Sequence, residues 1–476
     1  MKSHRWIVSF FVLAMAAFPV YEGPLYEPDE GRYAEIGREM LVSGDWIVPR
    51  LNGEPHLTKP PFAYWMAAVG TLLCGNNERG ARIMVSVAFV GLCLLAAMLG
   101  TMLHDRRTGL LAALIHATSL QPFLLGHFLS ADVFVSFWQA AAVTAAVAAW
   151  KSPLRRGRRL AWLVWFSFGM AFMTKGPPGL LAVIPLLLVG LQRRMAGQPR
   201  VIFNIPGLLL FLVVSHWWYV LLVLKDPDLL RYFVVDEVWN RVFTDAHHRD
   251  NTPLIYLGGL TIGMLPWTGT WRLVFRSIGT WFQKGSRNIP YPYLLMGGWI
   301  LPALLVFVFA RSRLIMYIGP LFVPLSVLFA RARLYRGAPS PLATSPWKLA
   351  AWCLLLLGGV HAFRSVQWGR ELADVAEAMV QDAGARPFAV INGSGDACGS
   401  LPFLSRSPTP AIVLKRHQAR ASLAEGTLSL VVPRVSDSLI YMLVRTKDMA
   451  RIHWRRPPPL VVHQGRRLTL LRLDAP

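Results

Sequence analysis

Acidic and basic residues are concentrated in one short stretch of this sequence. Residues 26–61 hold seven of the chain's 26 acidic residues. A helix beginning near Asp29 would place Asp29, Arg32, Ile36 and Glu39 along one face, at spacings of three and four. A carboxylate and a guanidinium side by side can orient or deprotonate a nucleophile and bind an anion. The alternative interpretation is a solvated loop helix held by salt bridges.

Three further charged residues lie beside apolar segments. Lys59 precedes Pro60 and Pro61 at a stiff turn, and Asp132 is the second residue of the otherwise uncharged run "ADVFVSFWQAAAVTAAVAAW". Lys175 lies in "TKGPPG", which interrupts two apolar runs. Ionisable groups near hydrocarbon are costly, so we hypothesise that each of these three residues is functional. For Lys175 the alternative is a side chain that snorkels to the membrane surface.

A second polar stretch adds Glu237 and Arg241 at a spacing of four, which suits a supporting ion pair on a helix. His247 and His248 are adjacent, so their side chains point apart, and a solvated pair is a better interpretation than a metal site. Arg313 comes just before another aromatic-containing apolar segment.

The composition identifies the class of protein that must position these residues. The chain has 476 residues, of which 54% are hydrophobic and 16% charged, and its mean hydropathy is +0.41. Soluble domains carry roughly a quarter charged residues. We therefore predict a mainly α, polytopic membrane protein with about 11 transmembrane helices (range 11–13). The apolar segments that could span a bilayer are 6–21, 83–103, 108–129, 131–150, 160–174, 177–191, 201–224, 253–271, 291–310, 314–330 and 347–363.

The net charge of +23 is unevenly distributed. Threading the spans alternately from a cytoplasmic N-terminus places six segments inside, and these hold 20 of the 49 Lys and Arg residues but one acid, Asp105. This is the positive-inside asymmetry of a membrane protein, so we infer no nucleic acid as a partner. The six segments are 1–5, 104–107, 151–159, 192–200, 272–290 and 331–348.

Two segments test this threading. Residues 160–191 have basic flanks on both sides, so they must form a hairpin that turns at Thr174–Gly179. Phe62–Gly75 is apolar but short, and we interpret it as an outer-surface or re-entrant helix. Met1–Tyr21 resembles a secretion signal but lacks a convincing cleavage site, so we expect a retained first span.

The threading divides the chain into two domains. Residues 1–363 would form the transmembrane domain, with outer loops at 22–82, which carries juxtamembrane helices, and at 225–252. From 364 to 476, strand-like runs ("PFAVI", "TLSLVV", "PPLVVH", "RLTLLRL") accompany the helix-like "ELADVAEAMVQDAG", which predicts a small extracytoplasmic α/β domain. Cys74 and Cys398 would both face outside, where they could form a disulfide.

Under this threading the charged motifs all emerge on the outer side of the membrane, which predicts one extracytoplasmic site. Several cations around one or two carboxylates suit a phosphate-bearing substrate, and at a membrane the natural phosphate carrier is a lipid. A transporter or lipid flippase also needs intramembrane charges, but the two related halves common in transporters are not visible. A non-catalytic assembly scaffold is a third possibility.

The stretch "PDEGRYAEIGREMLVSGDWIVPRLNGEPHLTKPPFAYW" resembles the first outer loop of bacterial membrane glycosyltransferases of the aminoarabinose transferase type, which are related to the protein O-mannosyltransferases. "NNERGARI", "SADVFVSFW", "MTKGPPGLL" and "RSRLIMYIGPLFVPLSVL" extend the resemblance over most of residues 1–330. It implies the GT-C fold in the bacterial inner membrane, with a periplasmic active site. There a sugar would pass, with inversion, from polyprenyl (undecaprenyl) phosphate to lipid A, a related glycan or glycolipid, or a protein.

The resemblance also implies roles for individual residues. Asp29 matches the catalytic acid of the first loop, which would orient or deprotonate the acceptor, and Arg32 matches the basic residue beside it. Asp132 matches the second acidic motif. Lys59 matches the Lys-Pro-Pro cation near the donor phosphate, and Tyr317 matches an aromatic residue at that phosphate.

Other residues complete the predicted site. Lys175 and Arg313 would add cations at the donor phosphate, and Glu30 would support the loop together with Glu237 and Arg241. Thr58 stands where the family usually has Glu, a possible metal ligand. The loss of that carboxylate argues against a divalent metal, and we expect no other cofactor.

Overall fold

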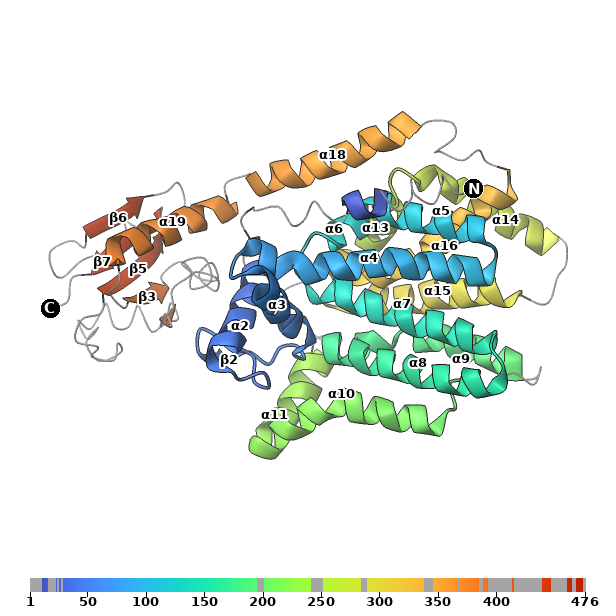
Figure 1. Ribbon diagram of the computed structural model, residues 1–476, viewed down its shortest axis with the longest axis horizontal. Coiled ribbons are helices and arrows are strands. Elements are labelled where there is room, and N and C mark those ends of the chain that lie inside the picture. Colours follow the sequence, from blue (N-terminus) through green and yellow to red (C-terminus); the bar gives the residue numbers. More distant parts are fainter. Residues whose placement is uncertain are drawn as a thin grey trace. The chain divides into compact units, whose positions relative to one another are not determined.

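The computed structural model of the chain is mainly helical (Figure 1). Part of the chain lies outside the described residues, including Cys398, His247 and His248, "TLSLVV", and the predicted first span except residues 11–15. The structure describes residues 11–15, 23, 25–26, 29–194, 201–240, 251–283, 289–337, 346–365, 368–384, 388–392, 413–414, 439–446, 460–464 and 468–473.

The chain forms two compact units. One, here the helical unit, comprises residues 1–19, 58–63 and 85–358. The other, here the mixed unit, comprises residues 20–57, 64–84 and 359–476. The domain boundaries predicted from composition, 1–363 and 364–476, stay a prediction.

Long helices packed side by side make up the helical unit (Figure 1). The closest pairs are α7 with α8, α8 with α10, α5 with α16, and α9 with α15. Its helices are α5 (Arg106–Thr118), α6 (Leu120–Leu125), α7 (Ala131–Trp150), α8 (Leu154–Lys175), α9 (Val183–Arg194), α10 (Ile205–Lys225), α11 (Asp228–Arg231), α13 (Leu254–Gly263), α14 (Trp271–Gln283), α15 (Tyr291–Phe309) and α16 (Phe322–Tyr335), with the ends of α4 (Glu78–Leu103) and α18 (Pro346–Ser365) extending into the mixed unit.

Several of these helices can cross a membrane. Among the described residues, six are long and apolar enough: Glu78–Leu103, Ala131–Trp150, Ile205–Lys225, Tyr291–Phe309, Ile315–Tyr335 and Pro346–Phe363. The apolar helices Phe62–Cys74, Pro177–Gln192 and Leu254–Gly263 are shorter. A multi-pass membrane protein is therefore supported, and the number of eleven spans stays a prediction.

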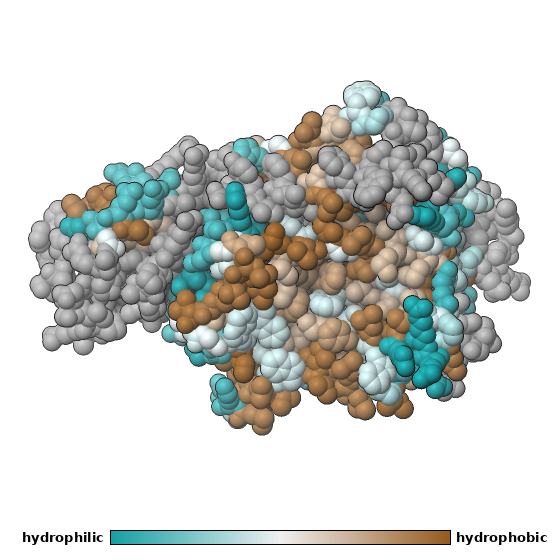
Figure 2. Space-filling view, in the orientation of Figure 1, coloured by the Kyte–Doolittle hydropathy of each residue, from teal (hydrophilic) through white to brown (hydrophobic). Residues whose placement is uncertain are grey.

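The surface of α10 is typical of a helix that faces lipid. Leu209, Leu212, Val213 and Val220 are all more than half exposed, and Leu224 is 76% exposed. Figure 2 shows hydrophobic side chains, in brown, over much of the visible face of the described helices. Such a continuous apolar surface requires a non-aqueous environment.

The apolar segment predicted at 108–129 is not one helix. α5 ends at Thr118, Ser119 is extended, and the backbone N–H of Leu120 donates to the carbonyl of Leu265 at 3.0 Å. Pro122 has no N–H to offer the carbonyl of Thr118, which accepts from the indole of Trp352 at 2.8 Å instead. Tertiary contacts therefore divide this segment into α5 and α6.

The predicted hairpin at Thr174–Gly179 is confirmed. α8 ends at Lys175, Gly176 has φ +67°, and a 3-10 turn at Pro177–Leu180 leads into α9. A positive φ favours glycine at this turn. α8 has 22 residues, about 33 Å at 1.5 Å per residue, so it is longer than its apolar part and includes the basic residues at its start.

The predicted helix of the first loop is also confirmed, as α2 (Asp29–Ser43) in the mixed unit. Gly37 lets α2 approach α3 (Phe62–Cys74), because an added Cβ would lie 2.8 Å from the backbone N of Ala68. A hairpin of β1 (Arg50–Leu51) and β2 (Glu54–Pro55) follows α2, and both residues of its turn, Asn52 and Gly53, have positive φ.

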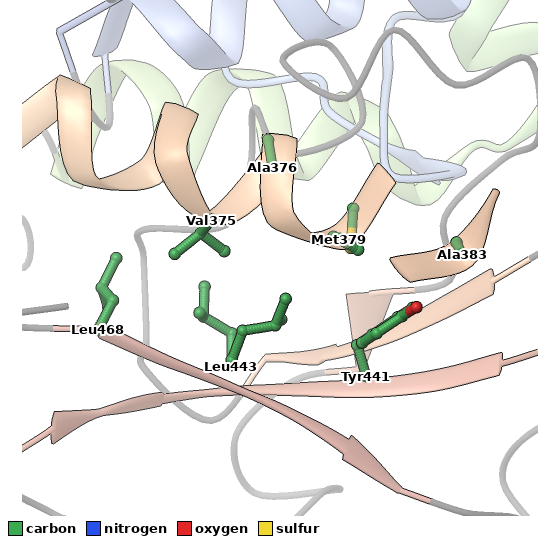
Figure 3. Close-up of a cluster of buried hydrophobic side chains, with 8 residues drawn as sticks. Val375, Ala376, Met379, Ala383, Tyr441, Leu443 and Leu468 are labelled. Atoms are coloured by element: carbon green, nitrogen blue, oxygen red, sulfur yellow. The ribbon is translucent and has the colours of Figure 1, made fainter. Parts of the chain in front are cut away.

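The C-terminal part combines helix α19 (Trp368–Ala383) with a five-stranded sheet of order β4-β3-β5-β7-β6. Val375 and Met379 of α19 pack on Tyr441 and Leu443 of β5 (Figure 3). β3 is parallel to β4 and β5, and β7 is antiparallel to β5 and β6. The strands are β3 (Phe388–Asn392), β4 (Val413–Leu414), β5 (Leu439–Arg445), β6 (Leu460–Gln464) and β7 (Leu468–Leu473).

Candidate active site

An ion pair joins α7 and α8 of the helical unit. These helices are consecutive and packed together, so the first turn of α7 meets the last turn of α8. Asp132 lies in that first turn, where Ser130 caps the helix, and Lys175 ends α8. The Nζ of Lys175 donates to Oδ1 of Asp132, and the two side chains are only 12% and 10% exposed.

An aromatic ring completes this cluster. Tyr317 lies in the 3-10 helix η5 (Ile315–Leu321), and the Nζ of Lys175 lies 4.0 Å from the centre of its ring. Such a contact stabilises a cation electrostatically. The structure thus brings together three of the residues predicted from the sequence, Asp132, Lys175 and Tyr317, which we call the lysine cluster.

The Lys-Pro-Pro turn is anchored to the same helix as Asp132. Lys59 is partly buried, and Phe62, three residues later, packs edge-on against Phe134 and Trp138 of α7 at 5.8 and 5.7 Å. Phe134 follows Asp132 by two residues. The short segment 58–63 therefore places Lys59 in the helical unit with the lysine cluster.

Tyr256 of α13 was not predicted from the sequence. It is completely buried, and its hydroxyl makes no hydrogen bond of ordinary geometry with a described residue, although the backbone of Leu314 interacts with it. Its ring lies 5.9 Å from that of Phe307, which also contacts Tyr317 at 6.3 Å, and Tyr256 interacts electrostatically with Tyr317 and Asp132. A tyrosine in "PLIYLGGL" carries no pattern that would separate it from an ordinary core residue.

Arg313 makes backbone contacts in this structure. Its guanidinium donates to the carbonyl of Val308 at 3.1 and 3.3 Å and to that of Asn251 at 2.9 Å. The side chain of Asn251 in turn donates to the carbonyl of Arg313 at 2.9 Å. Arg313 therefore ties residue 251 to the segment before η5, and its role at a phosphate stays a prediction.

The first-loop pair lies in the mixed unit. Arg32 donates to Asp29 at 2.7 Å, and these side chains are 32% and 50% exposed. The predicted sharing of one helix face by this carboxylate and guanidinium is thus confirmed. Their partial exposure leaves both groups accessible to a ligand.

Glu30 is held quite differently from its neighbour Asp29. Arg82 of α4 donates to both carboxylate oxygens of Glu30, at 2.9 and 2.6 Å, and to the carbonyl of Gly23 at 2.8 Å. The backbone N–H of Tyr26 also donates to Glu30 at 2.9 Å. Sequence reasoning did not identify Arg82, because 52 positions separate the partners, although "NNERGARI" contains it.

A second buried pair lies further along α2. Arg38 donates from two nitrogens to Glu35, at 2.9 and 2.7 Å. Burial raises the pKa of Glu35 to about 8, although Arg38 opposes the shift. Glu39 accepts from the backbone N–H of Gly53 at 3.1 Å, which fastens the β1–β2 turn to the helix.

The second polar loop is described only in part. Glu237 lies in a π-helix, Tyr232–Trp239, and accepts from the hydroxyl of Tyr232 at 3.0 Å. Arg241 lies outside the described residues, so its predicted pairing with Glu237 stays a prediction. Within the described ranges, no three His, Cys, Asp or Glu side chains gather as a metal site requires.

The lysine cluster is suited to binding an anion. A cation with one acidic partner can exchange that partner for an incoming oxyanion, and a site that largely excludes water strengthens the attraction. A fixed cation also stabilises negative charge that develops on a leaving oxygen.

Comparisons with known proteins agree with these observations. The family model for dolichyl-phosphate-mannose-protein mannosyltransferase matches residues 20–224. Two curated proteins named undecaprenyl phosphate-alpha-4-amino-4-deoxy-L-arabinose arabinosyl transferase are similar. The one from Pectobacterium carotovorum is 32% identical over 76% of this chain and 64% of its own length. The one from Aeromonas salmonicida is 30% identical over 76% and 68%. The chain thus spans only about two-thirds of their length.

Solved structures show the same fold. ArnT from Cupriavidus metallidurans bound to undecaprenyl phosphate superposes with a TM-score of 0.79 and 20% identity, over 99% of this chain and 98% of that one. The archaeal oligosaccharyltransferase AglB from Archaeoglobus fulgidus gives a TM-score of 0.54 and 13% identity, over 92% and 69%. The predicted mainly α, GT-C fold is confirmed.

Proposed function

This chain belongs to the family of undecaprenyl phosphate-aminoarabinose arabinosyl transferases, and on that premise we propose that it is a polyprenyl-phosphate-dependent glycosyltransferase. The donor is a sugar on undecaprenyl phosphate, with 4-amino-4-deoxy-L-arabinose as the first sugar to test. The acceptor is lipid A or a related glycolipid or glycan of the cell envelope, and a protein acceptor is the alternative.

One observation carries this proposal: a lysine and an aspartate, each about nine-tenths buried, are paired inside a unit made of apolar helices. Ionisable groups in such surroundings are costly unless they have a task. The charge of Lys175 suits a phosphate, and the aromatic ring of Tyr317 keeps the ammonium in place.

In the proposed reaction, the donor phosphate replaces Asp132 as the partner of the Lys175 ammonium. Lys59 and the Tyr256 hydroxyl donate to the same phosphate. An acceptor oxygen attacks C1 of the sugar from the face opposite the phosphate, and the C1–O bond breaks with its electron pair moving to the phosphate oxygen. The configuration at C1 is inverted, and the cations stabilise the charge that the phosphate gains.

Asp29 has the role of general base for the acceptor. Its carboxylate is half exposed and keeps one partner, Arg32, so it can accept the proton of the attacking group. Asp132, once its lysine contacts phosphate, holds the acceptor. These assignments rest on the family motif.

The proposed topology follows the charge distribution, with eleven spans in the bacterial inner membrane and the active site facing the periplasm. One contact supports it. Arg331 and Asp105 pair at 3.6 Å, joining two segments, 104–107 and 331–348, that were both predicted to be cytoplasmic.

We propose that no divalent metal is required, because Thr58 occupies the position of the usual acidic residue. Chelation with EDTA should leave the transfer rate unchanged, and a loss of activity that zinc or magnesium restores would contradict this.

The experiment is a transfer assay with the full chain in proteoliposomes, with undecaprenyl phosphate-linked aminoarabinose and lipid A. Mass spectrometry should detect lipid A that has gained the sugar only when protein and donor are both present. Donor that crosses the bilayer without product formation would identify a flippase instead. Sugar found on an added periplasmic protein extract but not on lipid A would select the protein acceptor.

A further inference from the structure

A cavity lies at the other end of α7 from the lysine cluster. Its volume is about 450 Å³, and it is lined by Asp105, Arg106, Arg107, Arg331 and Leu334. The neighbouring His104 interacts electrostatically with Lys151, the residue after the last turn of α7. Because α7 has 20 residues, its two ends are about 30 Å apart. The cavity is therefore separate from the proposed active site.

Asp105 is the carboxylate among the described residues that line this cavity, and it already accepts hydrogen bonds. Asp105 caps α5, accepting from the backbone N–H of Thr108 at 2.9 Å and from its hydroxyl at 3.1 Å. Burial alone would raise the pKa of Asp105, but the bonds from Thr108 and the charge of Arg331 outweigh it and lower the pKa. Asp105 therefore stays ionised and directed toward the helix end.

The three guanidinium groups have unused capacity. Arg106 and Arg107 are exposed and form no ion pair with any described residue. Arg331 reaches Asp105 only at 3.6 Å, and its buried Nε has no hydrogen-bond partner in the described part of the chain. Three cations thus surround one committed carboxylate.

The positive charge of this region also affects His104. Burial, followed by the charges of Arg331 and Lys151, lowers the pKa of His104 to about 4, with Asp105 opposing. His104 is therefore neutral at pH 7 and adds no further repulsion. The field that disfavours its protonation favours an anion.

We propose that this cavity binds the phosphate of an anionic phospholipid. Guanidinium groups match the geometry of phosphate oxygens, and Leu334 offers an apolar wall for the glycerol and first methylenes. The cavity adjoins Leu103, the last residue of α4, and Tyr335, the last residue of the segment Ile315–Tyr335 that η5 and α16 form. Both segments are long and apolar enough to span a membrane, so the cavity lies at the level of lipid headgroups. Its volume far exceeds the roughly 30 Å³ share of one water molecule and admits a headgroup.

The test measures retention of phosphatidylglycerol by the full chain, purified from mixed vesicles of phosphatidylglycerol and phosphatidylcholine and analysed by native mass spectrometry. The main variant is Arg106→Gln with Arg107→Gln, whose side chains form no ion pair with a described residue; Arg331→Gln is a second. The matched control is Arg155→Gln with Arg156→Gln, two exposed arginines of α8 that are also predicted to be cytoplasmic.

We expect affinity for phosphatidylglycerol to fall about fivefold for each cavity arginine removed, with the control unchanged. Unchanged retention in both cavity variants would overturn the proposal, as would an equal loss in the control, which would indicate general attraction to a charged surface. Titration with inorganic phosphate separates the two sources of phosphate. Displacement of the lipid at low concentrations of inorganic phosphate would overturn the lipid assignment in favour of free phosphate. Retention of the lipid would support binding of the lipid headgroup.

Discussion

Helix α2 and the lysine cluster both contain acid–base pairs, but the pairs are built differently. On α2, Glu30 and Glu35 are buried, and each receives two bonds from one arginine. In the helical unit, Lys175 makes one bond to Asp132 and one contact with an aromatic ring. Similar residues therefore serve as scaffold in the first region and as a binding site in the second.

The number of bonds explains this difference. The guanidinium of Arg82 donates to Glu30 and to Gly23, so turning it toward a substrate would leave a buried carboxylate unpaired, which is strongly destabilising. Lys175 can exchange its single acidic partner for phosphate at lower cost. Asp29 and Arg32, partly exposed at the start of α2, resemble the lysine cluster more than they resemble the buried pairs of their own helix.

The largest effect should come from Lys175→Gln, which removes the cation from the lysine cluster. We expect sugar transfer to fall by about 10³-fold, since one preorganised electrostatic contact to a transition state contributes 10²–10³. The control Lys151→Gln, at the opposite end of α7, should retain full activity. Equal activities of the two variants would remove the distinction drawn between binding site and scaffold.

The next effect belongs to Asp29→Asn, which removes the proposed general base but keeps the shape of the side chain. Transfer should fall by about 10²–10⁴-fold while donor binding remains largely intact. Glu54→Gln, at an exposed acid of the β2 strand, is the control. Unchanged turnover would refute the role of Asp29 as general base. A loss of donor binding would instead assign Asp29 to the donor phosphate site.

Much of this architecture can be predicted from the sequence, because local patterns determine it. Apolar length predicts α7, α10 and α15, and the break "TKGPPG" between basic flanks predicts the hairpin at Gly176. The start of α2 at Asp29 follows from the spacing of its charges.

What sequence reasoning missed depends on tertiary contacts. Arg82 pairs with Glu30, although 52 positions separate them in the sequence. The end of α5 depends on hydrogen bonds with the carbonyl of Leu265 and the indole of Trp352. Tyr256 becomes notable only when its hydroxyl is seen to be buried without a hydrogen bond of ordinary geometry to a described residue. Spacing within one helix cannot show any of these relations.

A smaller effect should follow from Tyr256→Phe, which deletes only that hydroxyl. Transfer should fall about tenfold, the effect of losing one hydrogen bond of about 1.4 kcal/mol to a charged phosphate. Without donor, the melting temperature should change little, because the hydroxyl makes no hydrogen bond of ordinary geometry with a described residue. A lower melting temperature with unchanged transfer would mean that Tyr256 has a structural role only.

The smallest effect on sugar transfer should come from Glu35→Gln, which changes how stability depends on pH. The pKa of Glu35 is about 8 in the folded chain and 4.5 for the free side chain. The folded state therefore holds the proton more tightly, so this contribution is full below about pH 4.5 and is lost as the pH rises through about 8. Between about pH 4.5 and 8, the melting temperature of the variant should fall less than that of the wild type. Identical pH profiles for the two proteins would show that Glu35 does not titrate in this range.

The most direct measurement is the binding of undecaprenyl phosphate, without a sugar, to the wild type, Lys175→Gln and Arg38→Lys in one membrane mimetic. If Lys175 holds the donor phosphate, Lys175→Gln should lose at least tenfold in affinity, equivalent to about 1.4 kcal/mol. Arg38→Lys, which alters a scaffold pair, should bind as the wild type does at temperatures where it is folded. Wild-type affinity in Lys175→Gln, or an equal loss in both variants, would contradict the assignment of the lysine cluster as the phosphate site.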